Sequence, residues 1–471
     1  MKDAYEVVII GSGFGGAITG CRLAEAGYSV CILERGKHYK KGEFPRKFDD
    51  SRDWFWNSKL DFNGFIDFRF DKDIAVLLSS GVGGGSLIYA NVHIRAPENI
   101  FKQGWPRDIN RDVLSSYYDK VAEMLNVSPL PEHKNLPKTE AIRKVADEIG
   151  KGNDWDKPDL AIYWGEERVE KEDPYGFGID IVQTGCRYCG ECVIGCNYYS
   201  KNTLDLNYIP VAVNNGAECF PLHEVSKIEQ EDEGYNVFYR DLDKKTEGVV
   251  FGKKVIVAAG SLGSTELLLR CRYQYKTLPK LSKSLGHNFS GNGDFLAGAL
   301  NTKGEFADLQ PRNGPTITSF IKYWNQYPEF YLEEGGMPLD ELVFLAGAFR
   351  PDSDYLKKLK RSILRSIFPR TIFRRRSNKL FIETIGKGEG ELPSDMMLFL
   401  AMGRDAADGQ IRLKRIFPLP FFPQKLDLRW RNKQSMPLFD KIIEEQKKVT
   451  EGLIPIWVCN FHFSHQKLSV V

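Results

Sequence analysis

An apolar run that leads directly into a glycine-rich turn constrains the fold of this chain more than any other feature. Residues 5–10 read Tyr-Glu-Val-Val-Ile-Ile, which is typical of a strand buried on both faces of a parallel sheet. Glycines fill much of residues 11–16, and the pattern of residues 17–26 then predicts a helix. A second apolar run at residues 29–33 predicts the next strand. Together these segments predict one βαβ unit of an α/β domain.

The spacing Gly11-x-Gly13-x-x-Gly16 is that of a dinucleotide-binding turn. The first glycine permits the tight turn, the second lets the backbone approach a pyrophosphate, and the third lets the helix pack closely on the strand. The diphosphate would lie at the positive end of the helix. Glu34 ends the second strand, where its carboxylate is placed to accept hydrogen bonds from a ribose hydroxyl. That carboxylate would repel the 2′-phosphate of NADP, so FAD and NAD remain as candidates.

The α/β pattern returns far along the chain, which predicts a discontinuous nucleotide domain. Residues 255–259 form a strand pattern that leads through a glycine-rich turn into a predicted helix at 265–272. Just before it, residues 235–239 and 248–251 flank the charged turn 241–245 and predict a β-meander.

Composition limits the partners and the compartment. The net charge of +2, from 65 Lys and Arg against 63 Asp and Glu, disfavours a nucleic-acid partner, because such binding needs a basic face. Apolar runs long enough to cross a membrane are absent from the sequence, as is the pattern of a secretion signal. Five of the nine cysteines stand singly, as expected for buried thiols in a reducing compartment. We therefore expect a cytoplasmic protein of two or more domains.

The other four cysteines follow the pattern Cys186-x-x-Cys189-x-x-Cys192-x-x-x-Cys196. This is the spacing of bacterial ferredoxins, in which thiolates on a tight loop bind a [4Fe–4S] cluster. Asn197 stands where ferredoxins have proline, and the sequence has one such quartet. The alternatives are a zinc site, redox-active disulfides and a metal-free loop of structural thiols.

Basic residues gather in the segment 350–379. Nine lysines and arginines lie between residues 357 and 376, interleaved with apolar residues at near-helical spacing. Such a segment either contacts an anionic membrane surface peripherally, where it could deliver a lipid-like substrate, or forms a solvated face.

A second glycine-rich run, residues 79–91, contains three consecutive glycines whose bare amides can approach a ring or a phosphate closely. With this run the chain resembles the glucose–methanol–choline (GMC) oxidoreductases, and among them the cholesterol-oxidase-like branch. The matching blocks follow the order of the family and are residues 11–16, 33–36, 81–86, 104–106, 117–118, 201–205, 258–268, 292–294, 399–405 and 438–452.

The resemblance implies an α/β fold (α+β overall), in which a Rossmann-like FAD-binding domain is joined to a discontinuous second domain built on an antiparallel sheet. The implied division is 1–100 and 200–300 for the FAD-binding domain, 101–199 for a connecting segment with the cysteine-rich loop, and 301–471 for a substrate-binding domain with the basic insertion 350–379.

FAD is the cofactor that the resemblance implies. In the family, the loop at 81–86 lies along the pyrophosphate and the isoalloxazine ring, and Val225 matches a strand position whose backbone contacts adenine. The residues expected to contact the cofactor are Gly11, Gly13, Phe14, Gly15, Gly16, Glu34, Gly83, Gly84, Ser86, Asn91, Val225 and Ala259. A [4Fe–4S] cluster near the flavin would give electrons an exit and favour a dehydrogenase over an oxidase.

Glu333 matches the position of an active-site glutamate in the cholesterol-oxidase-like branch. A carboxyl group that faces a closed apolar cavity has a raised pKa, which suits a base that takes the hydroxyl proton while hydride leaves for the flavin. The alternative is that Glu333 and Glu334 are solvent-facing charges at the entrance to a loop. The implied function is oxidation of the CH–OH group of an alcohol, either a sterol or another lipid-like alcohol, with oxygen or a redox carrier as the electron acceptor.

The last residues of the sequence depart from the pattern of the family. His462 and His465 are not followed by Pro-Leu-Gly-Gly, and the later Asn-Pro pair of the family has no match. We therefore expect the catalytic histidine and a central strand to be missing, with weak FAD binding and little alcohol oxidation. A catalytically inactive flavin-fold protein and a flavin dehydrogenase that passes electrons through a [4Fe–4S] cluster are the alternative functions.

Overall fold

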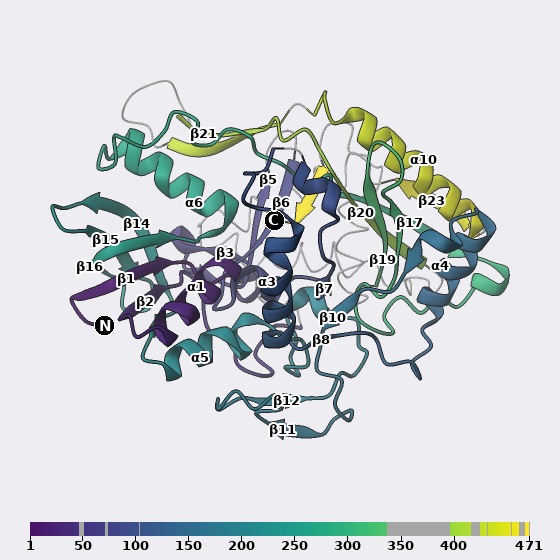
Figure 1. Cartoon of the computed structure of the whole chain (residues 1–471), viewed down its shortest axis with the longest axis horizontal. Coiled ribbons are helices and arrows are strands. Elements are labelled where there is room, and N and C mark those ends of the chain that lie inside the picture. Colours follow the sequence, from purple (N-terminus) through teal and green to yellow (C-terminus); the bar gives the residue numbers. More distant parts are fainter. Residues whose placement is uncertain are drawn as a thin grey trace, which may run out of the picture.

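The computed structural model describes residues 1–46, 51–70, 74–102, 104–336, 396–415, 424–430, 432–453, 455–460 and 467–470. The basic segment 350–379, with its predicted membrane contact at 357–376, lies outside these residues, as do His462 and His465. Two six-stranded sheets lie on opposite sides of the molecule (Figure 1). Within the described ranges, no helix is long and apolar enough to cross a membrane.

The first sheet contains the predicted βαβ unit. Four of its strands run parallel, and two form an antiparallel meander at one edge. In the order in which they lie side by side, the strands are β13 (Glu218–Phe220), β2 (Val30–Leu33), β1 (Ala4–Ile10), β16 (Thr246–Val257), β15 (Tyr235–Asp241) and β14 (His223–Gln230).

Helices cover both faces of this sheet, which explains why β1 is almost continuously apolar. The helices α1 (Phe14–Glu25) and α5 (Tyr208–Asn214) pack on one face, and α6 (Gly260–Leu269) packs on the other (Figure 1). The helices predicted at 17–26 and 265–272 are confirmed, and both begin earlier than predicted. The fold class predicted from the sequence is thus observed in this half of the molecule.

The separate strands predicted at 248–251 and 255–259 are one continuous strand, β16, so that prediction was wrong. Gly252 is the residue at which β16 changes partners. It pairs with Tyr235 in the antiparallel meander and with Tyr5 in the parallel part of the sheet. In the sequence, a glycine followed by two lysines resembles the end of a strand. Pairing with β15 before this point and with β1 after it keeps β16 extended.

The second sheet is antiparallel throughout, as predicted for the second domain. Two helices, α4 (Pro137–Glu148) and α10 (Met436–Gly452), cover one of its faces (Figure 1). The strand β9 (Trp155–Asp156) comes from the segment predicted as a connection, and the predicted domain boundaries stay a prediction. In order, the strands are β23 (Pro455–Asn460), β17 (Phe295–Thr302), β20 (Met396–Gly403), β19 (Phe330–Gly335), β18 (Phe320–Tyr323) and β9 (Trp155–Asp156).

Smaller elements connect the two sheets. A three-stranded sheet of β24 (Lys467–Val470), β6 (Ile74–Ser79) and β5 (Ile66–Phe70) lies near the middle of the molecule (Figure 1). The remaining elements are α2 (Ser51–Trp54), β3 (Trp56–Asn57), β4 (Phe62–Asn63), β7 (Val92–His93), α3 (Arg111–Met124), β8 (Val127–Ser128), β10 (Asp159–Ala161), β11 (Glu170–Glu172), β12 (Val182–Thr184), β21 (Gln410–Arg415) and β22 (Gln424–Arg429).

A fully buried ion pair joins α4 to the second sheet. The Nζ atom of Lys138 lies 2.7 Å from Oε2 of Glu334, and both side chains are 0% exposed. Lys138 also donates to the backbone oxygen of Thr316, and the other oxygen of Glu334 accepts from the amide and the hydroxyl of Thr318. The charges are therefore almost completely compensated by hydrogen bonds, which is the condition for tolerating a buried pair.

Replacing Lys138 with methionine should lower the free energy of unfolding by about 3–5 kcal/mol, because it leaves the carboxylate of Glu334 buried without its partner charge. Adding Glu334→Gln should recover part of this loss. The matched control is Lys102→Met, whose partner Glu98 is 73% exposed. The control should cost at most about 0.5 kcal/mol. Chemical denaturation of the purified chains measures both, and equal losses would contradict the assignment.

Candidate active site

The carboxyl ends of three parallel strands meet at the first glycine motif. Gly11 donates its amide to the carbonyl of Leu33 at the end of β2, with a distance of 2.8 Å. Ala258, at the end of β16, donates to the carbonyl of Ile10 at the same distance. Ligands of open α/β sheets bind at such an edge. Ala259 begins α6 directly beside this turn, at the position predicted for a cofactor contact.

The packing of the protein itself requires two of the three motif glycines. Gly11 has φ of +98°, and a Cβ atom there would lie 2.5 Å from the carbonyl oxygen of Ala258. A Cβ on Gly16 would lie 1.9 Å from the carbonyl oxygen of Gly11. On Gly13, in contrast, a Cβ would meet nothing nearer than Gly84 Cα at 3.8 Å. The absence of a side chain at Gly13 therefore leaves backbone open to a ligand, as a diphosphate needs.

The N-terminus of α1 is free to bind an anion. Its N-cap is Gly13, which makes no side-chain capping bond, and the first turn carries no acidic residue. The first amides of the helix thus point to the same open space beside Gly13. Phe14 opens the helix with its ring edge-on to Tyr89, at 5.6 Å between centroids, and a Cβ on Gly15 would touch the methyl group of Ala258.

The second glycine run lies against the first. Gly83 and Gly84 have φ of +101° and +53°, and a Cβ on Gly84 would lie 2.6 Å from Cα of Gly13. The hydroxyl of Ser86 donates to the carbonyl of Gly83 at 2.7 Å and accepts from the amide of Leu204 at 3.1 Å. The loops at 11–16 and 83–86 therefore form one rigid cradle of bare backbone.

Glu34 holds the two loops together. Its Oε2 accepts from the amide of Ser12 at 3.0 Å and from the hydroxyl of Ser12 at 2.7 Å, and that hydroxyl accepts from the amide of Gly83. Its Oε1 accepts from Gly36 at 2.9 Å. A carboxylate has about four acceptor positions, so one remains for a ribose hydroxyl. Sequence reasoning missed the structural part of this role, since nothing in the motif names Ser12 as the partner.

Val225 lies next to this end of β2. His223, two residues earlier at the start of β14, donates its amide to the carbonyl of Glu34 at 2.8 Å. The pairing of β14 with β15 is irregular between Val225 and Lys227. The predicted contact of the Val225 backbone with adenine stays a prediction. The place of Val225 beside the end of β2 is compatible with that contact.

Two polar residues at the end of the second glycine run, or just after it, have buried polar atoms without a partner in the described part of the chain. Asn91 has φ of +66°, and neither its amide nitrogen nor its oxygen has a hydrogen-bond partner among the described residues. His93 also keeps an unpartnered, buried Nε2 there, and burial lowers its pKa to about 4, so its ring is neutral. Sequence reasoning named Asn91 but missed His93. The signal available was a histidine two residues beyond the glycine-rich block.

The carboxyl group of Glu333 is buried and has no hydrogen-bond partner within the described ranges. Its side chain is 1% exposed, and neither carboxyl oxygen has a hydrogen-bond partner there. Burial, with smaller contributions from the negative charges of Asp294 and Glu334, raises its pKa from 4.5 to about 8. The alternative of solvent-facing charges is wrong for both glutamates, because Glu334 is equally buried.

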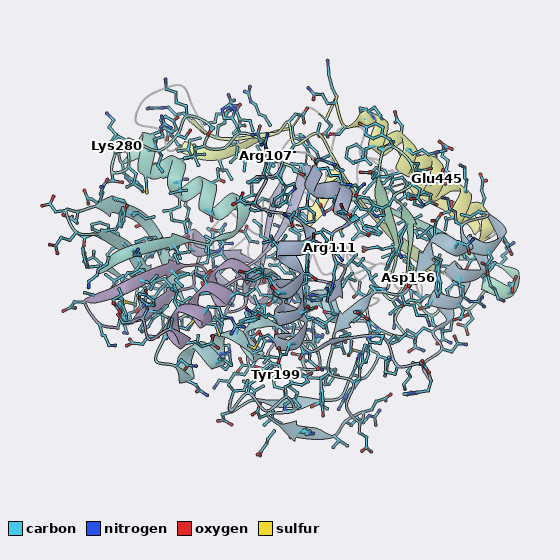
Figure 2. The ribbon with its side chains drawn as sticks, viewed as in Figure 1. Arg107, Arg111, Asp156, Tyr199, Lys280 and Glu445 are labelled. Carbon is cyan, nitrogen blue, oxygen red and sulfur yellow. The ribbon has the colours of Figure 1, made fainter. Side chains whose placement is uncertain are left out.

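The alternation of β19 points Glu333 away from α4 and α10. Glu334 faces α4 through Lys138, so Glu333 and Tyr331 share the opposite face of the sheet. Arg111, at the start of α3 near the centre of the molecule (Figure 2), acts electrostatically on Tyr331. The carboxyl group of Glu333 therefore lies on the face that looks toward the middle of the molecule.

A buried lysine connects the cradle to the cysteine loop. The Nζ atom of Lys201 donates to the carbonyls of Leu87 at 2.8 Å, Tyr89 at 3.2 Å and Cys192 at 2.6 Å. Burial lowers its pKa to about 8. Asp205 belongs to the same family-matching block as Lys201, residues 201–205. It is buried beside Gly83, and burial raises its pKa.

The four clustered cysteines line one small cavity and form no disulfide. They are Cys186, Cys189, Cys192 and Cys196. In the portion of the chain that the structure describes, no three His, Cys, Asp or Glu side chains converge as ligands of a metal ion. The structure therefore brings the predicted quartet to one cavity, and the [4Fe–4S] cluster stays a prediction.

Family models match two stretches that meet at this site. The model described as GMC oxidoreductase matches residues 175–290, and the one described as NAD(P)-binding Rossmann-like domain matches residues 9–39. A cholesterol oxidase of Mycobacterium tuberculosis is 33% identical over 332 residues, which are 68% of this chain and 57% of that protein. The chain belongs to the GMC oxidoreductase family. Within this family it is similar to the cholesterol-oxidase-like branch, as its sequence blocks predicted.

Further relatives share less of their length with this GMC chain. A cholesterol oxidase of Acinetobacter baumannii is 31% identical over 313 residues, 62% of this chain and 55% of that protein. A long-chain-alcohol oxidase of Arabidopsis thaliana is 25% identical over 287 residues, 57% of this chain and 34% of that protein. The chain spans little more than half the length of the cholesterol oxidases from M. tuberculosis and A. baumannii.

A solved structure supports the fold. Pyridoxine 4-oxidase from Mesorbium loti superposes with a TM-score of 0.56 and 12% sequence identity, covering 94% of this chain and 80% of that chain. The dinucleotide-binding architecture, the open helix N-terminus and the bare backbone at Gly13 all fit a flavin dinucleotide.

Replacing Gly13 with alanine should leave the stability of the chain nearly unchanged, because its Cβ has room in the protein, but should sharply reduce the amount of flavin that co-purifies. Gly16→Ala should instead destabilise the fold by several kcal/mol, because its Cβ collides with backbone. Thermal unfolding and the visible absorbance of bound flavin separate the two effects. Full flavin occupancy in Gly13→Ala would contradict the role of this residue.

Glu333 also predicts a pH dependence of stability. The folded state holds its proton up to a pH of about 8, whereas an ordinary glutamate loses it near 4.5. Stability should therefore fall as pH rises through this window. Glu333→Gln removes the cost of the buried charge, so its melting temperature should exceed that of the wild type by a few degrees at pH above about 8 and match it below about 4.5. A constant difference across the window would argue against a raised pKa.

Proposed function

We propose that this chain is an FAD-dependent oxidoreductase that oxidises the CH–OH group of an alcohol. The observation that carries the proposal is Glu333, a fully buried carboxyl group without a partner in the described ranges, on the sheet face turned toward the middle of the molecule. A buried, unsatisfied acid of this kind costs stability and is typical of a functional site.

The cofactor contacts proposed for FAD are those that the cradle offers. The first turn of α1 would bind the diphosphate, and Glu34 would bind a ribose hydroxyl with its remaining acceptor position. The run from Gly83 to Asn91 would lie along the ring, where bare backbone permits close approach. The flavin supplies the acceptor for the hydride of the alcohol carbon.

Glu333 would act as the general base. In its ionised form, a carboxylate oxygen accepts the proton of the substrate hydroxyl as the C–H bond gives up its hydride. Its burial excludes water and keeps the carboxylate unsolvated, which strengthens it as a base. His93, neutral because of its burial, and the unpartnered amide of Asn91 are the further polar groups that could bind the hydroxyl.

The substrate class follows from the relatives. Two of them are cholesterol oxidases and one is a long-chain-alcohol oxidase, so a sterol or another lipid-like alcohol is the substrate that we propose. Oxygen is the acceptor that the oxidase names suggest. Peripheral membrane contact through 357–376 stays a prediction, and that segment lies outside the described residues.

One observation favours a second candidate function, an alcohol dehydrogenase that passes electrons through a [4Fe–4S] cluster to a one-electron carrier protein. Lys201 contacts the carbonyls of Leu87 and Tyr89 in the flavin loop and that of Cys192 in the cysteine loop. The two loops are thus direct neighbours through one side chain.

Glu333→Gln should bind flavin as the wild type does and lose alcohol-dependent reduction of a redox dye by about 10²–10⁴-fold, the usual contribution of a general base. In the wild type, kcat/KM should rise with pH and level off above about 8, since the base must be ionised. The matched control is Glu305→Gln, an exposed carboxylate paired with Lys144 on the surface, which should leave turnover unchanged.

The same dye-reduction assay distinguishes an active enzyme from a catalytically inactive flavin-fold protein. A wild-type chain that holds flavin but reduces no dye with sterols or long-chain alcohols would favour a catalytically inactive flavin-fold protein. Unchanged turnover in the Glu333→Gln variant would show that Glu333 is not the general base.

A further inference from the structure

We propose that Cys186, Cys189, Cys192 and Cys196 bind a [4Fe–4S] cluster in the cavity that they line. This proposal goes beyond the alcohol chemistry and does not depend on it, because it rests on the cysteine loop alone. The four side chains come from one short segment, and all of them border the same small cavity.

The fourth cysteine makes the set complete. In ferredoxins with two clusters, the last cysteine of this spacing ligates the other cluster. Here Cys196 lines the same cavity as Cys186, so one cavity has the four thiol ligands that a single cluster needs. The absence of a second quartet from the sequence is therefore no obstacle.

The loop is already folded into a tight curve. Tyr188, Gly190 and Gly195 have φ of +57°, +73° and +82°, which bends the chain back on itself between successive cysteines. Gly314 donates its amide to the carbonyl of Tyr188 at 2.8 Å, and Cys186 donates to Tyr163 at 3.1 Å. Contacts from other segments thus fix the backbone of the loop at both of these points.

Arg46 clamps the other side of the loop. Its guanidinium donates to the carboxylate of Glu191 at 2.8 Å and to the carbonyls of Ile194 and Gly195 at 3.2 and 2.6 Å. Tyr199 (Figure 2), just after the last cysteine, donates its hydroxyl to the carbonyl of Tyr39 at 2.8 Å. Both contacts hold the segment from Cys189 to Cys196 closed over the cavity.

The cavity suits an anion. A cluster with four thiolate ligands carries net negative charge, and the cavity is bordered by the cationic side chains of Lys201 and Arg187. Glu191, an acidic residue that also borders the cavity, forms an ion pair with Arg46. Ser200 also borders the cavity, is 2% exposed, and has a hydroxyl without a partner in the described part of the chain. That hydroxyl could donate to a cluster sulfur.

A cluster fits these observations better than the alternatives. None of the four cysteines is in a disulfide. A zinc ion would draw its sulfur ligands to about 2.3 Å from one point. The spacing of the four cysteines is that of a ferredoxin loop, whereas a zinc site would need a rearranged spacing. A cluster places each cysteine on a different iron, so its ligands border a core, as the four cysteines border this cavity.

The test is metal analysis of the whole chain purified without oxygen, before and after incubation with ferrous iron and sulfide. We expect about four iron atoms and four acid-labile sulfides per chain, with a paramagnetic signal on reduction. Cys192→Ser and Cys196→Ser should each lose most of the iron. The matched control is Cys219→Ser, a single cysteine in β13, which should keep it.

Bound flavin and circular dichroism show whether a variant has folded, so loss of iron from a misfolded chain is recognised. Iron-free wild-type protein after reconstitution, a stoichiometric zinc ion in place of iron, or iron retained when all four cysteines are replaced would each overturn the proposal. None of these results would affect the dye-reduction assay, so failure of this proposal and failure of alcohol oxidation can be told apart.

Discussion

The contact between two glycine-rich loops organises the rest of this molecule. The loops are far apart in the sequence, and a Cβ atom on Gly84 would lie only 2.6 Å from Cα of Gly13, so the two backbones meet directly. Ser12 and Glu34 hold them in place with hydrogen bonds that are all buried. Because these bonds replace water, their loss would leave unsatisfied polar groups in the centre of the fold. The protein's own hydrogen bonds thus hold together the two loops of the cradle.

Two adjacent glutamates on β19 show how strand geometry assigns chemistry. Glu334 lies on the helix-covered face and is satisfied by Lys138 and Thr318. Glu333 lies on the other face, has no partner in the described ranges, and has a raised pKa. Exchanging the two environments would require a shift of only one residue in strand register, so the pairing of β19 with β18 and β20 keeps Glu333 on the face away from the helices.

Much of this could be predicted from the sequence, because local rules govern it. A buried β-branched run, a glycine turn and an amphipathic helix predicted the βαβ unit, and the spacing of the cysteines predicted that they would gather. The rest depends on contacts between distant segments. The continuity of β16 through Gly252 arises because the strand has a different partner on each side. The partner of Glu334, the structural role of Glu34 and the burial of His93 likewise depend on tertiary packing, which no local pattern encodes.

The hydrogen bonds of Lys201 restrict the movement of the two loops that it joins. Its ammonium group has three hydrogens, and three backbone carbonyls from two loops take all of them. Neither loop can therefore move away without leaving one of these carbonyls unpaired in the interior. An exchange of either loop with that of a relative would have to preserve the distances to this one nitrogen. The cradle and the cysteine loop are thus one mechanical unit, although more than a hundred residues of sequence separate Tyr89 from Cys192.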